Sequence, residues 1–122
     1  MKVLLSIKPQ FAEKILSGEK VYEYRKRIFK KDVDTVLIYS TKPVGVIIGE
    51  FKIDKIIHSD KKTVWNKTKL KSGISKEFYE TYFSASSDAY AIKVKSVKKY
   101  DKPIKLEELR PNLKAPQSYC YI

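Results

Sequence analysis

A change of hydrophobic period within Ser6–Arg27 constrains the fold more than any other feature of the sequence. In its first half, Phe11, Ile15 and Leu16 recur at a spacing that places them along one side of a helix. Gly18 follows, and glycine is the residue that most easily adopts the left-handed conformation at a helix C-terminus. Beyond the glycine the side chains alternate with a period of two, which is typical of a strand. The segment therefore predicts a short helix, a tight turn and a strand.

The strand expected over residues 21–29 carries charge on one face. Tyr22 and Tyr24 point to one side of such a strand, whereas Glu23 and Arg25 point to the other. We therefore expect a half-buried strand whose charged residues lie on its open face.

Charged residues also flank the predicted helix and turn. Lys8 comes just before the helix and Lys20 just after it, so both lie close in sequence to Glu23 and Arg25. These four side chains predict a positively charged cleft beside the first helix. Ser40, Thr41, Gln117 and Ser118 are further candidates for ligand binding in this cleft.

The remaining pattern predicts an α+β fold, a mostly antiparallel pseudobarrel of about five or six strands with short helices at its ends. Strands are expected over residues 3–7, 35–41, 44–58 and 88–100, and helices over 60–67 and around 75–83. The aromatic residues Phe78, Tyr79, Tyr82 and Phe83 of the last helix are expected to pack in the core. We expect one domain over residues 1–122, with residues 101–122 wrapping the outside of the barrel.

Composition indicates the class of partner. The net charge of +12, from 26 Lys and Arg against 14 Asp and Glu, favours polyanions such as nucleic acids. RNA or a nucleotide-like ligand is the expected partner, and DNA stays an open alternative. Arg27, Lys93 and Lys95 are candidates for contacts with a nucleic-acid backbone.

Other features argue against several classes of protein and site. Cys120 is the only cysteine and His58 the only histidine, so we expect no disulfide within the chain, no metal site and no cofactor. The apolar run Val3–Leu5 is too short for a signal-peptide core or a membrane span, which predicts a cytoplasmic protein without a membrane partner.

Three interpretations of the charged cleft stay open. In the first, Lys8 and Arg25 bind phosphate or sugar oxygens while Tyr22, Tyr39 or Tyr119 stacks on a base. In the second, the protein is an enzyme in which Glu23 is a general base and Lys20 stabilises a developing oxyanion. In the third, Glu23 and Arg25 form an ion pair with a purely structural role.

The chain resembles the ASCH domain family, a branch of the PUA-like superfold. The resemblance rests on ILSGEK at residues 15–20 leading to EYR at residues 23–25, on residues 43–51, and on the terminal PQSYCYI. It implies a pseudobarrel with a ligand cleft beside the first helix. Family members are mostly described as RNA-binding or coactivator-associated modules, so a protein-interaction module in transcription regulation is an alternative function.

The resemblance also implies a possible enzyme activity. Some small bacterial relatives are amidohydrolases that deacetylate N4-acetylcytidine with a Lys, a Thr and a Glu, and one relative is reported as a ribonuclease. The family Lys corresponds to Lys20, but Glu23 stands where the family has Thr. The family Glu has no clear counterpart in Glu77 or Glu80. A small hydrolase acting on a modified nucleoside or on RNA is therefore the second alternative.

Overall fold

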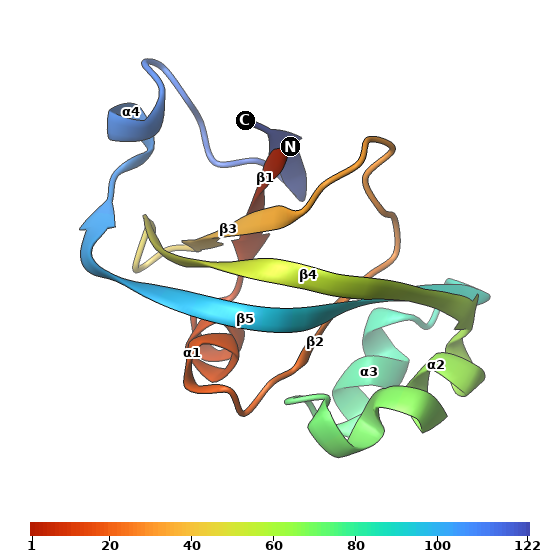
Figure 1. Cartoon of the computed structure of the whole chain (residues 1–122). Coiled ribbons are helices and arrows are strands. Elements are labelled where there is room, and N and C mark those ends of the chain that lie inside the picture. Colours follow the sequence, from red (N-terminus) through yellow and green to blue (C-terminus); the bar gives the residue numbers. More distant parts are fainter.

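One sheet of six strands, in the order β2-β5-β4-β3-β1-β6, organises the computed structural model, which describes residues 1–122 (Figure 1). The strands are β1 (Lys2–Ile7), β2 (Tyr22–Arg25), β3 (Thr35–Ser40), β4 (Val46–Asp60), β5 (Asp88–Ile104) and β6 (Tyr119–Tyr121). The helices are α1 (Pro9–Ser17), α2 (Lys61–Thr68), α3 (Lys76–Tyr82) and α4 (Leu106–Leu109), with a 3-10 turn η1 (Lys69–Lys71) after α2. Only the β1–β3 pair is parallel. The prediction of a mostly antiparallel α+β pseudobarrel is confirmed, in the form of a sheet curled into a half-barrel.

The first helix and turn form as the sequence predicts. Pro9 occupies the first turn of α1, where its missing N–H has no intrahelical partner to lose. Gly18 ends the helix with φ 85° and donates its N–H to the carbonyl of Ile15. The turn then directs the chain into β2, at the edge of the sheet.

The long strands β4 and β5 bend along their length. Their pairing shifts register near Gly49, as the glycine pattern of the sequence suggests. A Cβ atom at Gly49 would lie 2.6 Å from the Lys98 carbonyl oxygen and 2.9 Å from Leu16 Cδ2. Only glycine therefore permits this close approach of β4 to β5 and α1. At the other end of these two strands, where β4 ends and β5 begins, α2 and α3 lie together against the sheet (Figure 1).

Three hydrophobic clusters fill the molecule. The largest lies between α1 and the sheet and includes Val3, Leu5 and Ile15. A second cluster, around Tyr79 and Phe83, joins α2 and α3 to the sheet. The third lies where β1, β3 and β4 meet α4 and the C-terminal segment. None of the helices is long and apolar enough to cross a membrane.

Two expectations about β2 are wrong. The strand covers only Tyr22–Arg25 rather than residues 21–29, because its partner β5 begins at Asp88, close to the end of this pairing. The charged face is not open either, since Glu23 is only 7% exposed. The half-barrel curls so that β2 approaches the end of β1 and the start of α1, which covers the face that carries Glu23.

Candidate functional site

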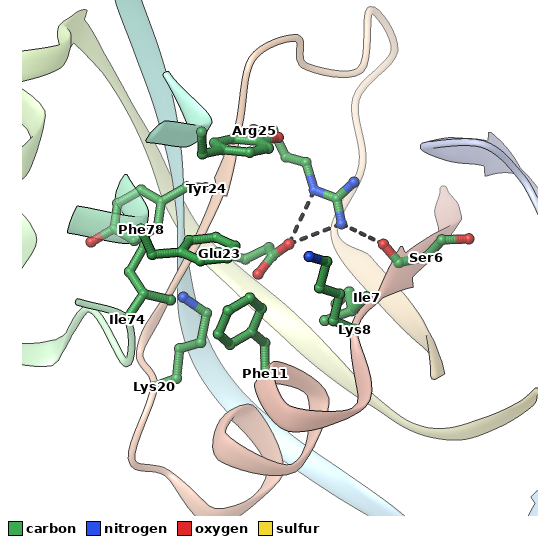
Figure 2. Close-up of a pocket in the computed structure, with 11 residues that line it drawn as sticks. Ser6, Ile7, Lys8, Phe11, Lys20, Glu23, Tyr24, Arg25, Ile74 and Phe78 are labelled. Atoms are coloured by element: carbon green, nitrogen blue, oxygen red, sulfur yellow. Dashed lines mark hydrogen bonds and ion pairs between the residues drawn. The ribbon is translucent and has the colours of Figure 1, made fainter. Parts of the chain in front are cut away.

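A pocket of about 260 Å³ lies where the two ends of the half-barrel approach each other (Figure 2). We call it the aromatic pocket. It is lined by Ser6, Ile7, Lys8 and Phe11 from β1 and α1, by Lys20, Glu23, Tyr24 and Arg25 from the turn and β2, and by Ile74, Phe78 and Tyr82 from the segment around α3. The structure thus brings together all four charged residues that the sequence assigns to the cleft.

Lys20 is the most unusual residue of the aromatic pocket, because its side chain is 2% exposed and has no ion-pair partner within 4 Å. Its Nζ donates a hydrogen bond to the carbonyl of Ser72 at 2.6 Å. The same nitrogen lies 4.8 Å from the ring centroid of Tyr24 and 5.5 Å from that of Phe11. Burial lowers the pKa of Lys20 to about 8, although Glu23 acts in the opposite direction. Lys20 can therefore exchange a proton close to neutral pH.

The Glu23 carboxylate lies at the centre of the labelled side chains in Figure 2. Arg25 donates to one of its oxygens, Oε2, from Nη2 at 2.9 Å and from Nε at 3.1 Å. The other oxygen, Oε1, accepts no hydrogen bond from the protein. The predicted ion pair is therefore present, and it leaves one carboxylate oxygen available to a ligand.

Arg25 also closes the gap between the two edges of the curled sheet. Its Nη2 donates to the carbonyl of Ser6 at 2.7 Å, and its Nη1 donates to the Ser118 hydroxyl at 3.3 Å. Ser6 in turn holds the C-terminal segment, because its N–H donates to the Ser118 carbonyl and its hydroxyl to the Pro116 carbonyl. Arg25 consequently links β2 to β1 and to the segment before β6.

The aromatic rings of the pocket are not those that the sequence analysis proposed for base stacking. Tyr39 is buried in the third hydrophobic cluster, Tyr119 packs edge-on against Phe29, and Tyr22 packs on the second cluster. The rings that line the pocket belong to Phe11, Tyr24, Phe78 and Tyr82.

The prediction for the aromatic residues of α3 is half right. Tyr79 and Phe83 are buried in the second cluster, whereas Phe78 lines the pocket, and Tyr82 both packs against that cluster and lines the pocket. Phe78 and Tyr82 are four residues apart, so they share one side of the helix. This spacing is visible in the sequence, but nothing in the sequence shows which side faces a cavity.

The other predicted ligand-binding residues lie outside the pocket lining. Ser40 is 1% exposed and lies within the sheet, paired with Ile7 and Val46. Thr41 and Gln117 are not among the lining residues either, and Ser118 reaches the pocket only through Arg25.

The candidates for backbone contacts lie on the surface or at its edge. Arg27 and Lys95 are exposed, and Arg27 follows the pocket residue Arg25 by two positions. Lys93 is partly buried on β5, and its Nζ lies 3.5 Å from the Asp54 carboxylate. Lys8, at the pocket itself, makes no ion pair, and its Nζ lies 5.2 Å from the ring centroid of Phe78.

Comparison with known proteins identifies related chains. The family model described as the ASCH domain matches residues 5–102. An ASCH domain-containing ribonuclease from Zymomonas mobilis is 30% identical over 125 residues, which cover 99% of this chain and 84% of the relative.

Two longer relatives come from Ureaplasma parvum. Proteins named ATP synthase subunit alpha and large ribosomal subunit protein uL22 are 35% and 28% identical to this chain over 98% of its length. The matched region makes up only 15% and 39% of these two proteins.

Solved structures agree with the sequence matches. The crystal structure of ASCH from Zymomonas mobilis superposes with a TM-score of 0.92 at 30% identity, covering 99% of this chain and 87% of that one. The N-terminal domain of Staphylothermus marinus McrB gives a TM-score of 0.55 at 14% identity over 92% of this chain and 80% of that chain. The latter similarity concerns the fold alone.

Proposed function

The chain belongs to the ASCH domain family, and from this premise we propose that it binds single-stranded RNA by holding one unstacked base in the aromatic pocket. The observation that carries the proposal is a buried carboxylate with one free oxygen, surrounded by aromatic rings. Proteins that read single-stranded RNA stack splayed bases on aromatic side chains and hydrogen-bond the base edges. The pocket offers both kinds of contact, and the relative from Zymomonas mobilis is named as a ribonuclease.

The free oxygen of Glu23 is an acceptor for an N–H donor on the edge of a base. A buried acceptor that receives no hydrogen bond from the ligand is left unpaired, which weakens binding. Adenine and cytosine can donate an amino hydrogen to Oε1, guanine an amino or an imino hydrogen, and uracil its imino N3–H. A site built around a buried polar group rejects analogues that lack the matching group. We therefore propose that the pocket binds a base through an N–H donor on its edge, and that it disfavours a base whose only such donor is blocked.

Lys8 supplies the contact with the RNA backbone in this proposal. It lies at the pocket without an ion-pair partner, so its ammonium group is available to a phosphate. Arg25 keeps Glu23 in place while its guanidinium remains partly accessible from the pocket. Arg27, Lys93 and Lys95 would extend this backbone contact along the surface.

The test is a fluorescence-anisotropy titration with short labelled RNAs of A, C, G or U at several salt concentrations. We expect log K to fall linearly with log salt, by roughly 0.7 per phosphate contacted. Oligo-U methylated at N3 should bind more weakly than unmodified oligo-U, because the methyl group removes the only N–H donor of the base edge. Phe78→Ala should weaken binding of both, whereas Tyr90→Ala removes a ring outside the pocket and should not. RNA binding that does not respond to salt, or that survives Phe78→Ala unchanged, would contradict the proposal.

A second candidate function is cleavage of the bound RNA. The pKa of about 8 leaves part of the Lys20 population neutral near physiological pH, as a general base requires. The neutral amine would accept the proton of a ribose 2′-hydroxyl as its oxygen attacks the adjacent phosphorus. The 5′-oxygen of the next nucleotide would then leave and take a proton from water, giving a 2′,3′-cyclic phosphate and a 5′-hydroxyl end, and the Lys20 ammonium group would return its extra proton to the solvent.

Lys20→Arg tests this candidate, because a guanidinium stays protonated and cannot act as a base. The variant should bind RNA but no longer produce cyclic phosphate ends. Cleavage at the wild-type rate by Lys20→Arg would remove Lys20 from the reaction.

A further inference from the structure

Helix α3 separates the aromatic pocket from a second cavity of about 400 Å³ between α2 and α3. We call this second cavity the Trp65 pocket. Trp65 and Tyr79 form its aromatic part, and Lys62, Lys76, Asn66 and Glu80 contribute polar groups. None of these residues lines the aromatic pocket.

The aromatic part of the Trp65 pocket offers one accessible ring. The rings of Trp65 and Tyr79 are 4.7 Å apart between centroids. Tyr79 is 3% exposed and donates its hydroxyl to the Lys61 carbonyl at 2.7 Å, so it is held within the core. Trp65 is only half-buried and packs on the second cluster, so part of its indole faces the cavity. An accessible aromatic face can stack on any of the four bases, so such a contact does not depend on the nucleotide sequence.

The charges of the Trp65 pocket favour an anion. Three lysines and one glutamate line it, Lys61 among them. Lys61 donates to the Phe83 carbonyl at 2.9 Å, which gives it a structural role. Lys62 makes no ion pair, and Lys76 approaches Glu80 only at 3.9 Å in an exposed position. Two ammonium groups therefore remain available for phosphates.

Opposite sides of α3 face the two cavities. Phe78 and Tyr82 turn toward the aromatic pocket, whereas Lys76, Tyr79 and Glu80 line the Trp65 pocket. A helix with its side chains is about 10–12 Å across. A single nucleic-acid strand that crosses α3 can therefore place one base on each side of it.

We propose that the Trp65 pocket is a second nucleotide subsite, in which Trp65 stacks on a base while Lys62 and Lys76 bind phosphates of the RNA strand that enters the aromatic pocket. This inference rests on the proposed RNA binding. It adds a site on another face of the molecule and makes α3 the element that the strand crosses.

Trp65 supplies its own probe, because it is the only tryptophan of the chain. A single-stranded ten-nucleotide RNA should quench its fluorescence over the same concentration range in which the anisotropy of the labelled RNA rises. Lys62→Ala combined with Lys76→Ala should weaken binding on the order of tenfold at low salt. The dependence of log K on log salt should also become less steep, by about 1.4 for two lost phosphate contacts.

Lys67→Ala combined with Lys69→Ala is the matched control. These lysines lie on α2 and η1, are exposed and line neither pocket. The control should change both affinity and salt dependence less than the Lys62 and Lys76 pair does. Circular dichroism melting of each variant verifies that the fold is intact.

The outcomes separate this inference from the proposed function. RNA binding without tryptophan quenching, or equal losses in the two double variants, would overturn the second subsite and leave the aromatic pocket standing. A protein that binds no RNA at any salt concentration would overturn both. Quenching that persists in Phe78→Ala, at higher RNA concentrations, would support two separate subsites.

Discussion

The aliphatic chain of Lys20 lies directly against the backbone of Gly73. A Cβ atom at Gly73 would be 2.5 Å from Lys20 Cβ and 2.6 Å from Cγ, and the glycine has φ +69°. The Lys20 ammonium group completes the contact by donating to the Ser72 carbonyl. One residue of the turn after α1 thus fixes the segment that leads into α3, and with it the position of Phe78.

Gly73→Ala should therefore destabilise the protein and weaken RNA binding together. The added methyl group meets Lys20 and also imposes a left-handed conformation on a residue with a side chain. We expect the free energy of unfolding to fall by about 2–4 kcal/mol, measured by urea denaturation. Gly18→Ala is the control, because its φ is +85° but no atom lies within 4 Å of the added Cβ. It should cost only about 1 kcal/mol and leave RNA affinity unchanged. Equal effects of the two substitutions would show that the Lys20 contact is unimportant.

The buried lysine should make stability depend on pH in the alkaline range. The pKa of Lys20 falls from 10.5 to about 8 on folding, so between these values the unfolded chain binds more protons than the folded one. Stability from this group therefore rises as pH increases from about 8 toward 10.5, by about 3 kcal/mol in all. Burial raises the pKa of Tyr24, so above about pH 10 the contribution of Tyr24 to the stability falls as pH rises, opposite to that of Lys20.

Lys20→Met isolates this contribution, because methionine keeps an unbranched apolar chain without an ionisable group. The difference in unfolding free energy between wild type and variant, followed by urea denaturation from pH 7 to about 9.5, should change in favour of wild type as pH rises. A constant difference over this range would mean that Lys20 does not titrate as its burial implies.

Glu23 and Arg25 should stabilise the fold mainly as a pair. Their side chains are 9% and 11% exposed, so removing one leaves a charge buried without its partner. We expect Glu23→Ala or Arg25→Ala to lower the unfolding free energy by about 3 kcal/mol each. The double variant should lose much less than the sum, with a coupling energy of about 2 kcal/mol. The exposed pair Lys14 and Glu19, 3.7 Å apart, should show a coupling below about 1 kcal/mol in the same experiment. If the losses of unfolding free energy in the two single variants simply add up in the double variant, the ion pair does not stabilise the fold.

Backbone contacts outside the pocket should differ between Arg27 and Lys93. Arg27 is exposed and close in sequence to the pocket, whereas the Lys93 ammonium group already faces Asp54. Arg27→Ala should make the salt dependence of RNA binding less steep by about 0.7, and Lys93→Ala should change it less. Anisotropy titrations over a salt series measure both changes. A larger change for Lys93→Ala than for Arg27→Ala would contradict the proposal that the RNA backbone passes along Arg27.

Local sequence determined the elements of this protein. Pro9 and Gly18 mark the start and end of α1, and the alternating and β-branched runs predict most of the strands that the structure contains. The four charged residues of the pocket could also be selected, because they flank one short helix and turn and so cannot lie far apart. Such features depend on interactions between residues that are close in the sequence, so they can be recognised from the sequence alone.

Tertiary structure decided which faces of these elements are covered. The open face expected for Glu23 is closed because the sheet curls until Arg25 reaches Ser6, a contact that depends on the bends of β4 and β5. Likewise, Phe78 of α3 faces a cavity, whereas Phe83, directly after α3, lies in the core. The sequence by itself thus determined most of the helices and strands and pointed to the charged residues of the pocket. Curvature of the whole sheet decided burial and pocket lining, because these depend on distances between segments that only the complete fold fixes.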